Sequence, residues 1–408
     1  MSGRRVVVTG LGQRSPLGAT TKALVEGLTT GKSGITRAPE WDWVKDIRTR
    51  VVGRADAGDA AAFPRSIRRT AGRVGLLALA AMEDAIRDSG IPREEVAGED
   101  SWLLVGSTLG ALEDLDEMFF RLRSSSSVLG TQSAGTLRSM AHTAAISCAL
   151  HLGFRGRLMA PSAACATGSL CIGLGYEAIQ AGRAEIVLAG GADEGHVSTA
   201  ALFDSLRAAS AAFNDDPTAA SRPFDARRDG IVCSEGAGFL VMESIDRAKA
   251  RGATVYGEVK GFATTSSGTA ATTPDSDAIA RCIRSCLKDA GTAHGDVSWV
   301  NAHATGTLAG DAAEAGAIGE VLGPRIPVSS PKGHLGHTMA AAGSIESIVC
   351  LLMLKEGLVH PTLNLEEVSA DCRGVDHVTS VREGSLRTVL NNNFALGGIH
   401  TCLAFQRA

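Results

Sequence analysis

Residues 101–110 read SWLLVGSTLG, a short apolar run that ends in a glycine-containing turn. A continuous apolar run of this length is typical of a strand that is covered on both faces of its sheet. The helical pattern of residues 73–87 precedes it and stops at Asp88-Ser89-Gly90, where glycine suits a helix end. The local order is therefore helix, stop, strand and Gly-Thr turn.

The same order returns in the second half of the chain. A helical pattern covers residues 278–288, Asp289-Ala290-Gly291 stops it, and SWVN at residues 298–301 leads into TGTLAG at residues 305–310. Other short apolar runs, such as IVLAG at residues 186–190, alternate with amphipathic helical patterns. This recurrence predicts a duplicated, layered α/β architecture.

The boundary between the two halves is expected at residues 250/251, after a strand over 238–242 and before a strand over 255–259. Residues 1–250 then form the first half and residues 251–408 the second. No stretch rich in proline and serine separates them, so we expect one body with its chemistry at the junction. Residues 124–127 and 264–273 are expected to be loops.

Composition restricts the class of protein. With 408 residues and 44% hydrophobic content, the chain can bury a large core, and its net charge of -4 predicts no general attraction to nucleic acid. No run of 18 apolar residues occurs and the opening segment is too short for a signal sequence, so we expect no membrane span and a cytoplasmic location. Nine cysteines without a Cys-x-x-Cys pair argue against a disulfide framework, and we expect most of them to be reduced and buried.

The segment SAACATG, residues 162–168, places one cysteine at the junction of a strand and a helix. The helical pattern of residues 167–179 starts just after Cys165, so its thiol faces unpaired backbone N–H groups and the positive end of the helix dipole. Both features favour the thiolate, and small neighbouring residues leave space around the sulfur. We therefore interpret Cys165 as a nucleophile and the other eight cysteines as structural residues.

A histidine segment, NAHATGT at residues 301–307, follows the second tryptophan-containing strand. His303 is thus expected at the carboxyl end of a strand, where open sheets bind ligands. Thr305 and Thr307 alternate along the same loop and offer hydroxyls to a polar, amide-bearing part of a substrate. Asp311 and Glu314 follow just beyond.

A second histidine segment, KGHLGH at residues 332–337, contains Lys332, His334 and His337. A largely desolvated Lys332 ammonium needs a carboxylate partner, and we expect Asp311 or Glu314 to supply it. His334 has two possible roles: it is a structural residue, or it binds a metal together with His337. Because no third ligand occurs at a familiar spacing, we expect no metal.

Together these motifs resemble the β-ketoacyl-acyl carrier protein synthases, the condensing enzymes of fatty acid and polyketide assembly, and most closely synthases I and II. The similarity covers nearly the whole chain. Besides the segments above, it includes VTGLG at residues 8–12, ASRPFD at 220–225, RDG at 228–230 and the Gly397-Gly398 turn.

The resemblance implies a thiolase fold, with two β-α-β-α-β halves in a five-layered α-β-α-β-α arrangement. It also implies a decarboxylative Claisen condensation of a Cys-bound acyl group with malonyl-acyl carrier protein, which gives 3-oxoacyl-acyl carrier protein. Substrates would be carried on the 4'-phosphopantetheine of the carrier protein, and no other cofactor is expected. The expected partners are that carrier protein and a second subunit, either identical or a related chain-length factor.

The resemblance also assigns roles to residues. Cys165 would accept the acyl chain, while His303 and His337 would bind the malonyl thioester carbonyl during loss of carbon dioxide. Lys332 stands where the family's catalytic lysine stands, oriented by Asp311 or Glu314 in the second shell.

Further positions match the family's binding elements. The backbone N–H groups of Cys165 and Leu396 match the oxyanion-hole donors, and Thr305 and Thr307 match the threonines that hold phosphopantetheine. The family's Gly-Phe-Gly-Gly-Thr-Asn is replaced by ALGGIH at residues 395–400, so Leu396 takes the place of the aromatic gate of the acyl pocket. Leu109 stands at the position that sets the depth of this pocket.

A basic run at helical spacing comprises Arg65, Arg68, Arg69 and Arg73. Such a run can be a solvated helix face. The resemblance implies the alternative, a docking surface, because the family binds its acidic carrier protein near this position. Arg207 is expected to be a second docking contact.

Two other functions remain open. A non-catalytic chain-length partner would shape the pocket of another synthase, but such subunits usually lack the nucleophile that Cys165 provides. A thiolase would use a second cysteine near the end of the chain, and Cys402 falls in a strand-like run instead. The altered turn at residues 395–400 favours specialised polyketide synthesis over housekeeping fatty acid synthesis.

Overall fold

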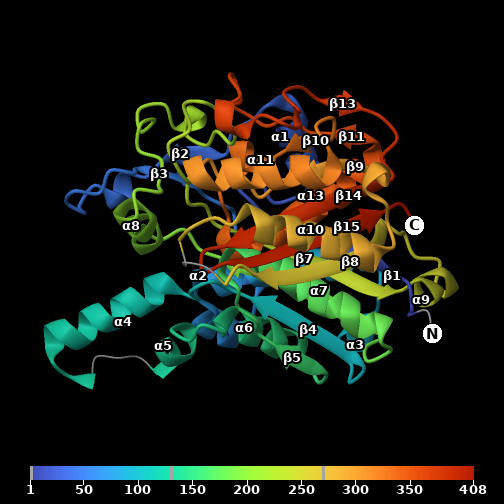
Figure 1. Cartoon of the computed structure of the whole chain (residues 1–408). Helices are drawn as coiled ribbons and strands as arrows, with labels where there is room; N and C mark the ends of the chain where they lie inside the picture. Colours follow the sequence, from blue (N-terminus) through green and yellow to red (C-terminus); the bar gives the residue numbers. More distant parts are fainter. Residues whose placement is uncertain (1–2, 129–132, 269–271) are drawn as a thin grey trace.

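The computed structural model describes residues 3–128, 133–268 and 272–408 (Figure 1). The strands of these residues form one eleven-stranded mixed sheet and two sheets of two strands. In spatial order the large sheet contains β12 (Asp376–His377), β10 (Pro327–Ser329), β9 (Val297–Asn301), β14 (Thr388–Ala395), β15 (Ile399–Gln406), β8 (Gly257–Ser266), β1 (Val6–Arg14), β7 (Gly236–Ser244), β6 (Ile186–Asp193), β4 (Ser101–Gly106) and β5 (Arg157–Met159). The small sheets pair β2 (Ile35–Arg37) with β3 (Val51–Gly53) and β11 (Leu358–Val359) with β13 (Arg382–Glu383).

The α-helices follow the chain in order. They are α1 (Thr21–Thr30), α2 (Arg65–Ser89), α3 (Arg93–Val96), α4 (Leu112–Ser125), α5 (Ser133–Arg138), α6 (Thr143–Leu152), α7 (Thr167–Gln180), α8 (Val197–Ser205), α9 (Ile245–Ala250), α10 (Ser276–Ala290), α11 (Leu308–Leu322), α12 (Lys332–Leu335) and α13 (Ala342–Glu356).

The large sheet consists of two halves with the same topology. In the first half β4 lies parallel to β5 and β6, β7 is antiparallel to β6, and β1 is antiparallel to β7. In the second half β9 lies parallel to β10 and β14, β15 is antiparallel to β14, and β8 is antiparallel to β15. The halves join where β1 pairs with β8, with Val6 opposite Val259. The predicted duplication is confirmed by this repeated strand order.

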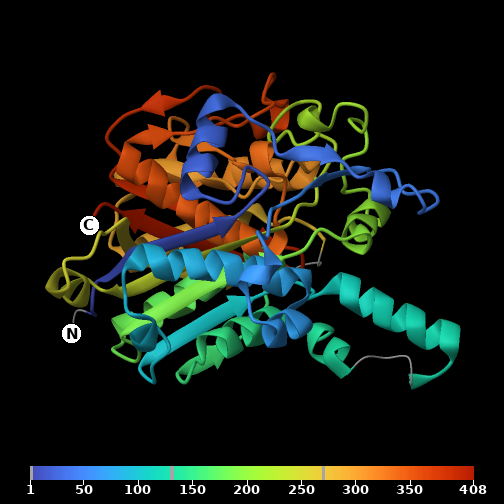
Figure 2. The same cartoon turned by 180° about the vertical axis from the view of Figure 1, so that it is seen from behind.

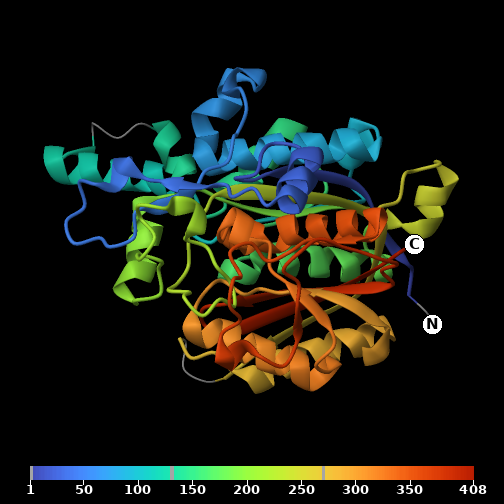
Figure 3. The same ribbon diagram turned by 90° about the horizontal axis from the view of Figure 1, so that it is seen from above.

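The helices complete five layers (Figures 2 and 3). Helices α7 and α13 contact strands of both half-sheets, so they form the middle layer. Helices α2 and α6 cover the outer face of the first half-sheet, and α10 with α11 covers that of the second. Because α13 lies between the two half-sheets, it is buried on every side from Ala342 to Leu354, in agreement with the apolar run of its second half, residues 348–354.

The two sequence repeats occupy equivalent places. Helix α2 ends before Gly90 at φ 65° and α10 ends before Gly291 at φ 58°, both in the left-handed region that glycine adopts without strain. The next strand of the large sheet contains the Ser-Trp pair in both halves, at the start of β4 and one residue into β9. The sequence pattern thus identified equivalent elements of the two halves.

Some boundaries differ from the prediction. Residues 264–266, expected in a loop, belong to β8 because Thr265 pairs with His400 of β15; residues 269–271 of the same predicted loop lie outside the described residues. Ser124 and Ser125 complete α4. All nine cysteines are free and buried, as predicted. Among the described residues, no helix has the length and apolar character needed to cross a membrane.

Candidate active site

Cys165 lies in a single 3-10 turn, Ala164–Ala166, directly before α7. The preceding Ala164 has φ 45°, a strained conformation for a residue with a Cβ atom, and such strain is concentrated at functional sites. At Gly168, a Cβ atom would lie 2.6 Å from the backbone nitrogen of Ser344, so glycine lets the first turn of α7 pack directly against α13. The nucleophile candidate is therefore held between the middle-layer helices.

The Cys165 thiol is protonated in the resting protein, contrary to the expected thiolate. Burial raises its pKa to about 12, although Lys332 and the backbone N–H groups of Leu396 and Cys165 act in the opposite direction. The helix terminus does not overcome this loss of hydration. These two N–H groups are the predicted oxyanion donors, and both favour negative charge at the sulfur.

The loop that carries His303 is fixed by the two carboxylates of α11. Glu314 accepts hydrogen bonds from the backbone N–H groups of His303 (2.9 Å) and Ala304 (2.7 Å). Asp311 accepts from those of Thr305 (3.0 Å) and Gly306 (3.1 Å). These carboxylates thus orient the loop backbone, and neither forms an ion pair with Lys332 in the described residues.

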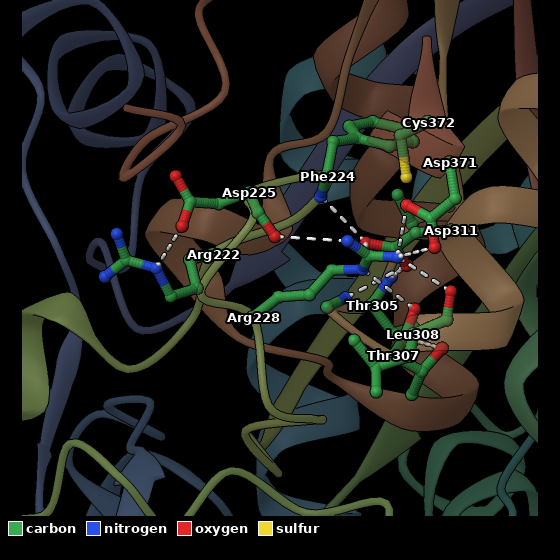
Figure 4. A network of polar contacts seen from close by, with 12 residues as sticks. Arg222, Phe224, Asp225, Arg228, Thr305, Thr307, Leu308, Asp311, Asp371 and Cys372 are labelled. Atoms are coloured by element: carbon green, nitrogen blue, oxygen red, sulfur yellow. Dashed lines mark hydrogen bonds and ion pairs between the residues drawn. The ribbon is translucent and has the colours of Figure 1, made fainter. Parts of the chain in front are cut away.

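Arg228 connects the first half of the chain to the same loop (Figure 4). Its fully buried guanidinium donates hydrogen bonds to the carbonyl oxygens of Thr307 (3.3 Å) and Leu308 (2.8 Å). It also pairs with Asp371 at 3.0 Å, and its Nε lies 3.8 Å from Asp311. The threonine loop is therefore held by α11 on one side and by Arg228 on the other.

Lys332 lies at the start of α12 with its side chain 1% exposed, and its Nζ forms an ion pair with Glu346 of α13. The other oxygen of Glu346 accepts a hydrogen bond from Asn393 Nδ2 at 2.6 Å. The expectation that Asp311 or Glu314 pairs with Lys332 is wrong, because both of those carboxylates turn toward the His303 loop. Glu346 is a site residue that sequence reasoning missed; an isolated carboxylate within an apolar helix was the available signal.

His303 and His337 face each other with ring centroids 5.2 Å apart and an interplanar angle of 87°. The backbone of His337 is fixed by the Val232–Ser234 segment, since its N–H donates to Val232 (2.8 Å) and its carbonyl accepts from Ser234 (2.9 Å). Burial, followed by the charge of Lys332, lowers the pKa of both imidazoles well below the usual value, so both are neutral at pH 7. Each then has one N–H donor available.

A cavity of about 490 Å³ brings the predicted residues together. Arg207 and Leu308 lie at its exposed mouth, whereas Cys165 is 6% exposed at its inner end. Predicted residues that line it are Cys165, His303, Thr305, Thr307, Asp311, Glu314, His337, Leu396 and Arg207. The ring nitrogens of His337 and Nδ1 of His303 have no hydrogen-bond partner among the described residues, so they are available to a guest.

Other predicted residues lie elsewhere. Leu109 is 40% exposed in the turn before α4, and Arg65, Arg68 and Arg69 are exposed on the first turns of α2; in the described part of the chain none of them lines this cavity. Arg73, the last arginine of the run, is 36% exposed, and its charge is paired with the buried carboxylate of Glu235.

His334 and Cys402 also lie outside the cavity. The ring nitrogens of His334 contact the carbonyl oxygens of Lys32 (3.0 Å) and Pro361 (3.2 Å), which indicates a structural role. No cluster of three potential metal ligands occurs in the described residues. Cys402 packs in the core beneath α10 rather than in the cavity, so the second cysteine of a thiolase site has no counterpart there.

Comparisons with known proteins agree with this arrangement. The family model of the β-ketoacyl synthase N-terminal domain matches residues 3–248, and that of the C-terminal domain matches residues 256–366. The chain is 34% identical to 3-oxoacyl-[acyl-carrier-protein] synthase 1 of Haemophilus influenzae over 99% of both chains. It is 35% identical to the tetracenomycin polyketide synthase ketoacyl synthase alpha subunit of Streptomyces glaucescens, over 99% of this chain and 97% of that one.

A solved structure is similar to this chain in both sequence and fold. The crystal structure of a β-ketoacyl synthase from Burkholderia phymatum STM815 matches with a TM-score of 0.95 and 38% identity, covering 99% of this chain and 100% of the other. The chain therefore belongs to the β-ketoacyl synthase family. It has the predicted thiolase fold and is an acyltransferase that performs the condensation step of fatty acid or polyketide biosynthesis.

Proposed function

We propose that Cys165 carries the acyl group and that this group is condensed with malonyl-acyl carrier protein to give 3-oxoacyl-acyl carrier protein. One observation carries the proposal: Cys165, His303 and His337 come from distant segments and line one cavity together with Thr305 and Thr307. The two threonine hydroxyls lie 3.3 Å apart on the cavity wall, where they can bind the amide groups of phosphopantetheine.

In the first step, the Cys165 sulfur attacks the carbonyl carbon of the acyl thioester, and the thiol proton passes to the departing pantetheine sulfur. The N–H groups of Cys165 and Leu396 stabilise the oxyanion. Each such donor contributes about 10²- to 10³-fold in rate. Since the resting thiol is neutral, the acyl-enzyme forms only when a carrier substrate is in position.

In the second step, His303 and His337 donate hydrogen bonds to the thioester carbonyl of the malonyl group. Loss of carbon dioxide leaves an enolate that these neutral imidazoles stabilise. The enolate carbon attacks the Cys165 thioester, a carbon–carbon bond forms, and the cysteine sulfur leaves and takes up a proton. Burial keeps both imidazoles unprotonated, and the charge of Lys332 lowers their pKa values further.

Cys165→Ala tests this assignment. The variant should lose self-acylation and condensation but retain decarboxylation of malonyl-carrier protein, because the histidines remain. Cys148→Ala, in α6 and remote from the cavity, is the matched control and should retain both activities. A Cys165→Ala variant that condenses at the parent rate would refute the assignment, and a parent chain that is never acylated would favour the non-catalytic partner.

A second subunit is proposed on the edge of the sheet. All three residues of β5 are exposed, including Leu158 (40%) and Met159 (37%). Because β5 is the last strand of the sheet, its free edge and these apolar side chains favour association with another chain. Helix α4 projects from the body on this side and exposes Phe119 and Phe120 (Figures 1 and 2). A two-fold axis beside β5 would pair it with its copy and bury these side chains together with Leu109 at the base of α4.

Sedimentation of the purified chain checks the assembly. A homodimer is expected, and Leu158→Lys should dissociate it, whereas Leu202→Lys, on the exposed surface of α8, should not. A parent chain that stays monomeric would contradict the homodimer. It would favour a heterodimer, an option raised by the relative that is itself called an alpha subunit.

The carrier protein is proposed to dock on the exposed arginines Arg65, Arg68, Arg69 and Arg207. Arg207 supports this best, because it lies at the cavity mouth. Arg207→Ala should raise KM for carrier-bound substrates and weaken its salt dependence, while the reaction with a free pantetheine thioester stays unchanged. Equal effects on both substrates would contradict docking.

Three further assignments remain proposals. We place the boundary of the two halves at residues 250/251, supported by the end of α9 at Ala250. We propose a cytoplasmic location, and a specialised pathway on the basis of the ALGGIH turn. The product series made with a cognate carrier protein, measured by mass spectrometry, tests the pathway: saturated-chain products alone would contradict it.

A further inference from the structure

Asp193 is a buried carboxylate to which the mechanism above gives no task. It is the last residue of β6 and is 4% exposed. Besides burial, its charge raises the pKa of the Cys165 thiol, so it lies close enough to act on the nucleophile. In the described part of the chain it does not line the cavity, and hydrogen bonds rather than an ion pair satisfy it. Since a buried carboxylate is costly unless several donors meet it, these donors show which segments it holds.

One carboxylate oxygen of Asp193 holds the turn that follows β4. This oxygen, Oδ1, accepts hydrogen bonds from the Ser107 hydroxyl (2.6 Å) and from the backbone N–H of Thr108 (3.0 Å). The carbonyl oxygen of Ser107 in turn accepts from the hydroxyl of Ser162 at 3.1 Å. Ser162 is the first residue of the SAACATG segment that contains Cys165. Asp193 is therefore connected to the segment of the nucleophile through Ser107.

The other oxygen holds the turn that follows His337. Oδ2 of Asp193 accepts a hydrogen bond from the backbone N–H of Ala340 at 2.8 Å. Ala340 belongs to the 3-10 turn Met339–Ala341, which lies between His337 and α13. A Cβ atom at Gly191 would lie 2.3 Å from the carbonyl oxygen of Ala340, so this turn packs directly against β6. The same carboxylate thus fixes the backbone just after one of the two catalytic histidines.

We propose that Asp193 is a positioning residue that holds the Cys165 segment and the His337 segment in the alignment needed for carbon–carbon bond formation. Decarboxylation of the malonyl group needs the histidines alone, whereas condensation also needs the Cys165 thioester carbon next to the enolate. A misplacement of about 1 Å can cost about 10²-fold in rate. An enolate that does not meet the thioester takes up a proton from water and becomes acetyl-carrier protein. Loss of Asp193 should therefore uncouple decarboxylation from condensation.

The inference rests on the proposed function, because it assumes that Cys165 carries the acyl group and that the histidines bind the malonyl group. The test starts from enzyme already acylated on Cys165, adds malonyl-carrier protein, and measures 3-oxoacyl product and acetyl-carrier protein by mass spectrometry. The parent should form mainly 3-oxoacyl product. Asp193→Ala should lower the ratio of 3-oxoacyl to acetyl product by about 10- to 100-fold. Asp193→Asn keeps one oxygen for the N–H of Ala340, so its ratio should lie between those of the parent and Asp193→Ala.

Glu194→Gln is the matched control, because Glu194 directly follows Asp193 and is also buried, at 5% exposure. Its carboxylate likewise accepts two backbone hydrogen bonds, from Val74 of α2 (3.1 Å) and Glu113 of α4 (2.8 Å). These contacts lead to the outer helices and away from Cys165 and His337. The substitution should leave the product ratio unchanged, whatever its effect on Tm.

Three results would overturn the inference: an Asp193→Ala variant with the parent's product ratio, an equal loss of both products in that variant, or the same fall of the ratio in Glu194→Gln. The second and third would assign Asp193 to the stability of the fold. If Asp193→Ala gives no cooperative thermal transition, Asp193→Asn decides, and a ratio equal to the parent's overturns the inference. A parent that is not acylated on Cys165 overturns the proposed function as well. A parent that is acylated and condenses, with a ratio insensitive to Asp193, overturns this inference alone.

Discussion

Glu346→Gln tests the buried ion pair behind the two imidazoles. The side chains of Lys332 and Glu346 are 1% and 2% exposed, so the substitution leaves an ammonium in the interior without a counter-charge. Removal of one partner of such a pair costs about 3–5 kcal/mol in free energy of unfolding. For a chain of 408 residues, an unfolding entropy of about 2.1 cal/mol/K per residue converts this loss into a Tm lower by roughly 4–6 °C.

Glu320→Gln is the matched control, because Glu320 also forms an ion pair, with Arg284, but is 52% exposed. Its loss should be about 0.5 kcal/mol or less. Calorimetry and urea titration of both variants give the comparison. The double variant Lys332→Met with Glu346→Leu should recover stability relative to Glu346→Gln, since it removes the uncompensated charge. A Glu346→Gln variant within about 1 kcal/mol of the parent would refute the reasoning.

The remaining predictions concern ionisation and positioning. Since burial raises the pKa of Cys165 to about 12, the rate of its alkylation by iodoacetamide should rise about tenfold per pH unit from pH 6 to 9; a plateau below pH 8 would contradict this. Because the pKa values of His303 and His337 lie well below 6.5, malonyl decarboxylation should keep its rate between pH 7.5 and 6.5, and an inflection within that range would contradict neutral imidazoles. Arg228→Lys should raise KM for carrier substrates by about 10- to 100-fold, the value of a charged hydrogen bond, with Cys165 alkylation unchanged. Arg222→Lys, equally buried and paired with Asp225, should leave KM unchanged.

The sequence was sufficient for features that depend on local order along the chain. The repeated helix, glycine stop and Ser-Trp strand identified the duplication, because these signals are set by backbone conformation and by burial of short apolar runs. Cys165, His303 and His337 were found in the same way, each directly after a strand or before a helix. The five-layer arrangement came from the family resemblance, and the contacts of α7 and α13 with both half-sheets agree with it.

Partnerships between distant segments were not predictable. The pairing of Lys332 with Glu346 depends on how α12 meets α13, whereas the acidic residues expected as partners, Asp311 and Glu314, are engaged by the His303 loop. Arg228 was recognised only as part of a motif, since its contact with the threonine loop depends on how the two halves meet. The prediction of a thiolate at Cys165 was wrong for a similar reason. A helix terminus is visible in the sequence, but the degree of burial that opposes it is set by the whole fold.

The most direct measurement is mass spectrometry of the chain after incubation with an acyl-carrier protein and without malonyl substrate. The account predicts one acyl group per chain, located on the peptide that contains Cys165 and released as 3-oxoacyl product when malonyl-carrier protein is added. An acyl group on any of the other eight cysteines, or condensation without a Cys165 adduct, would contradict it.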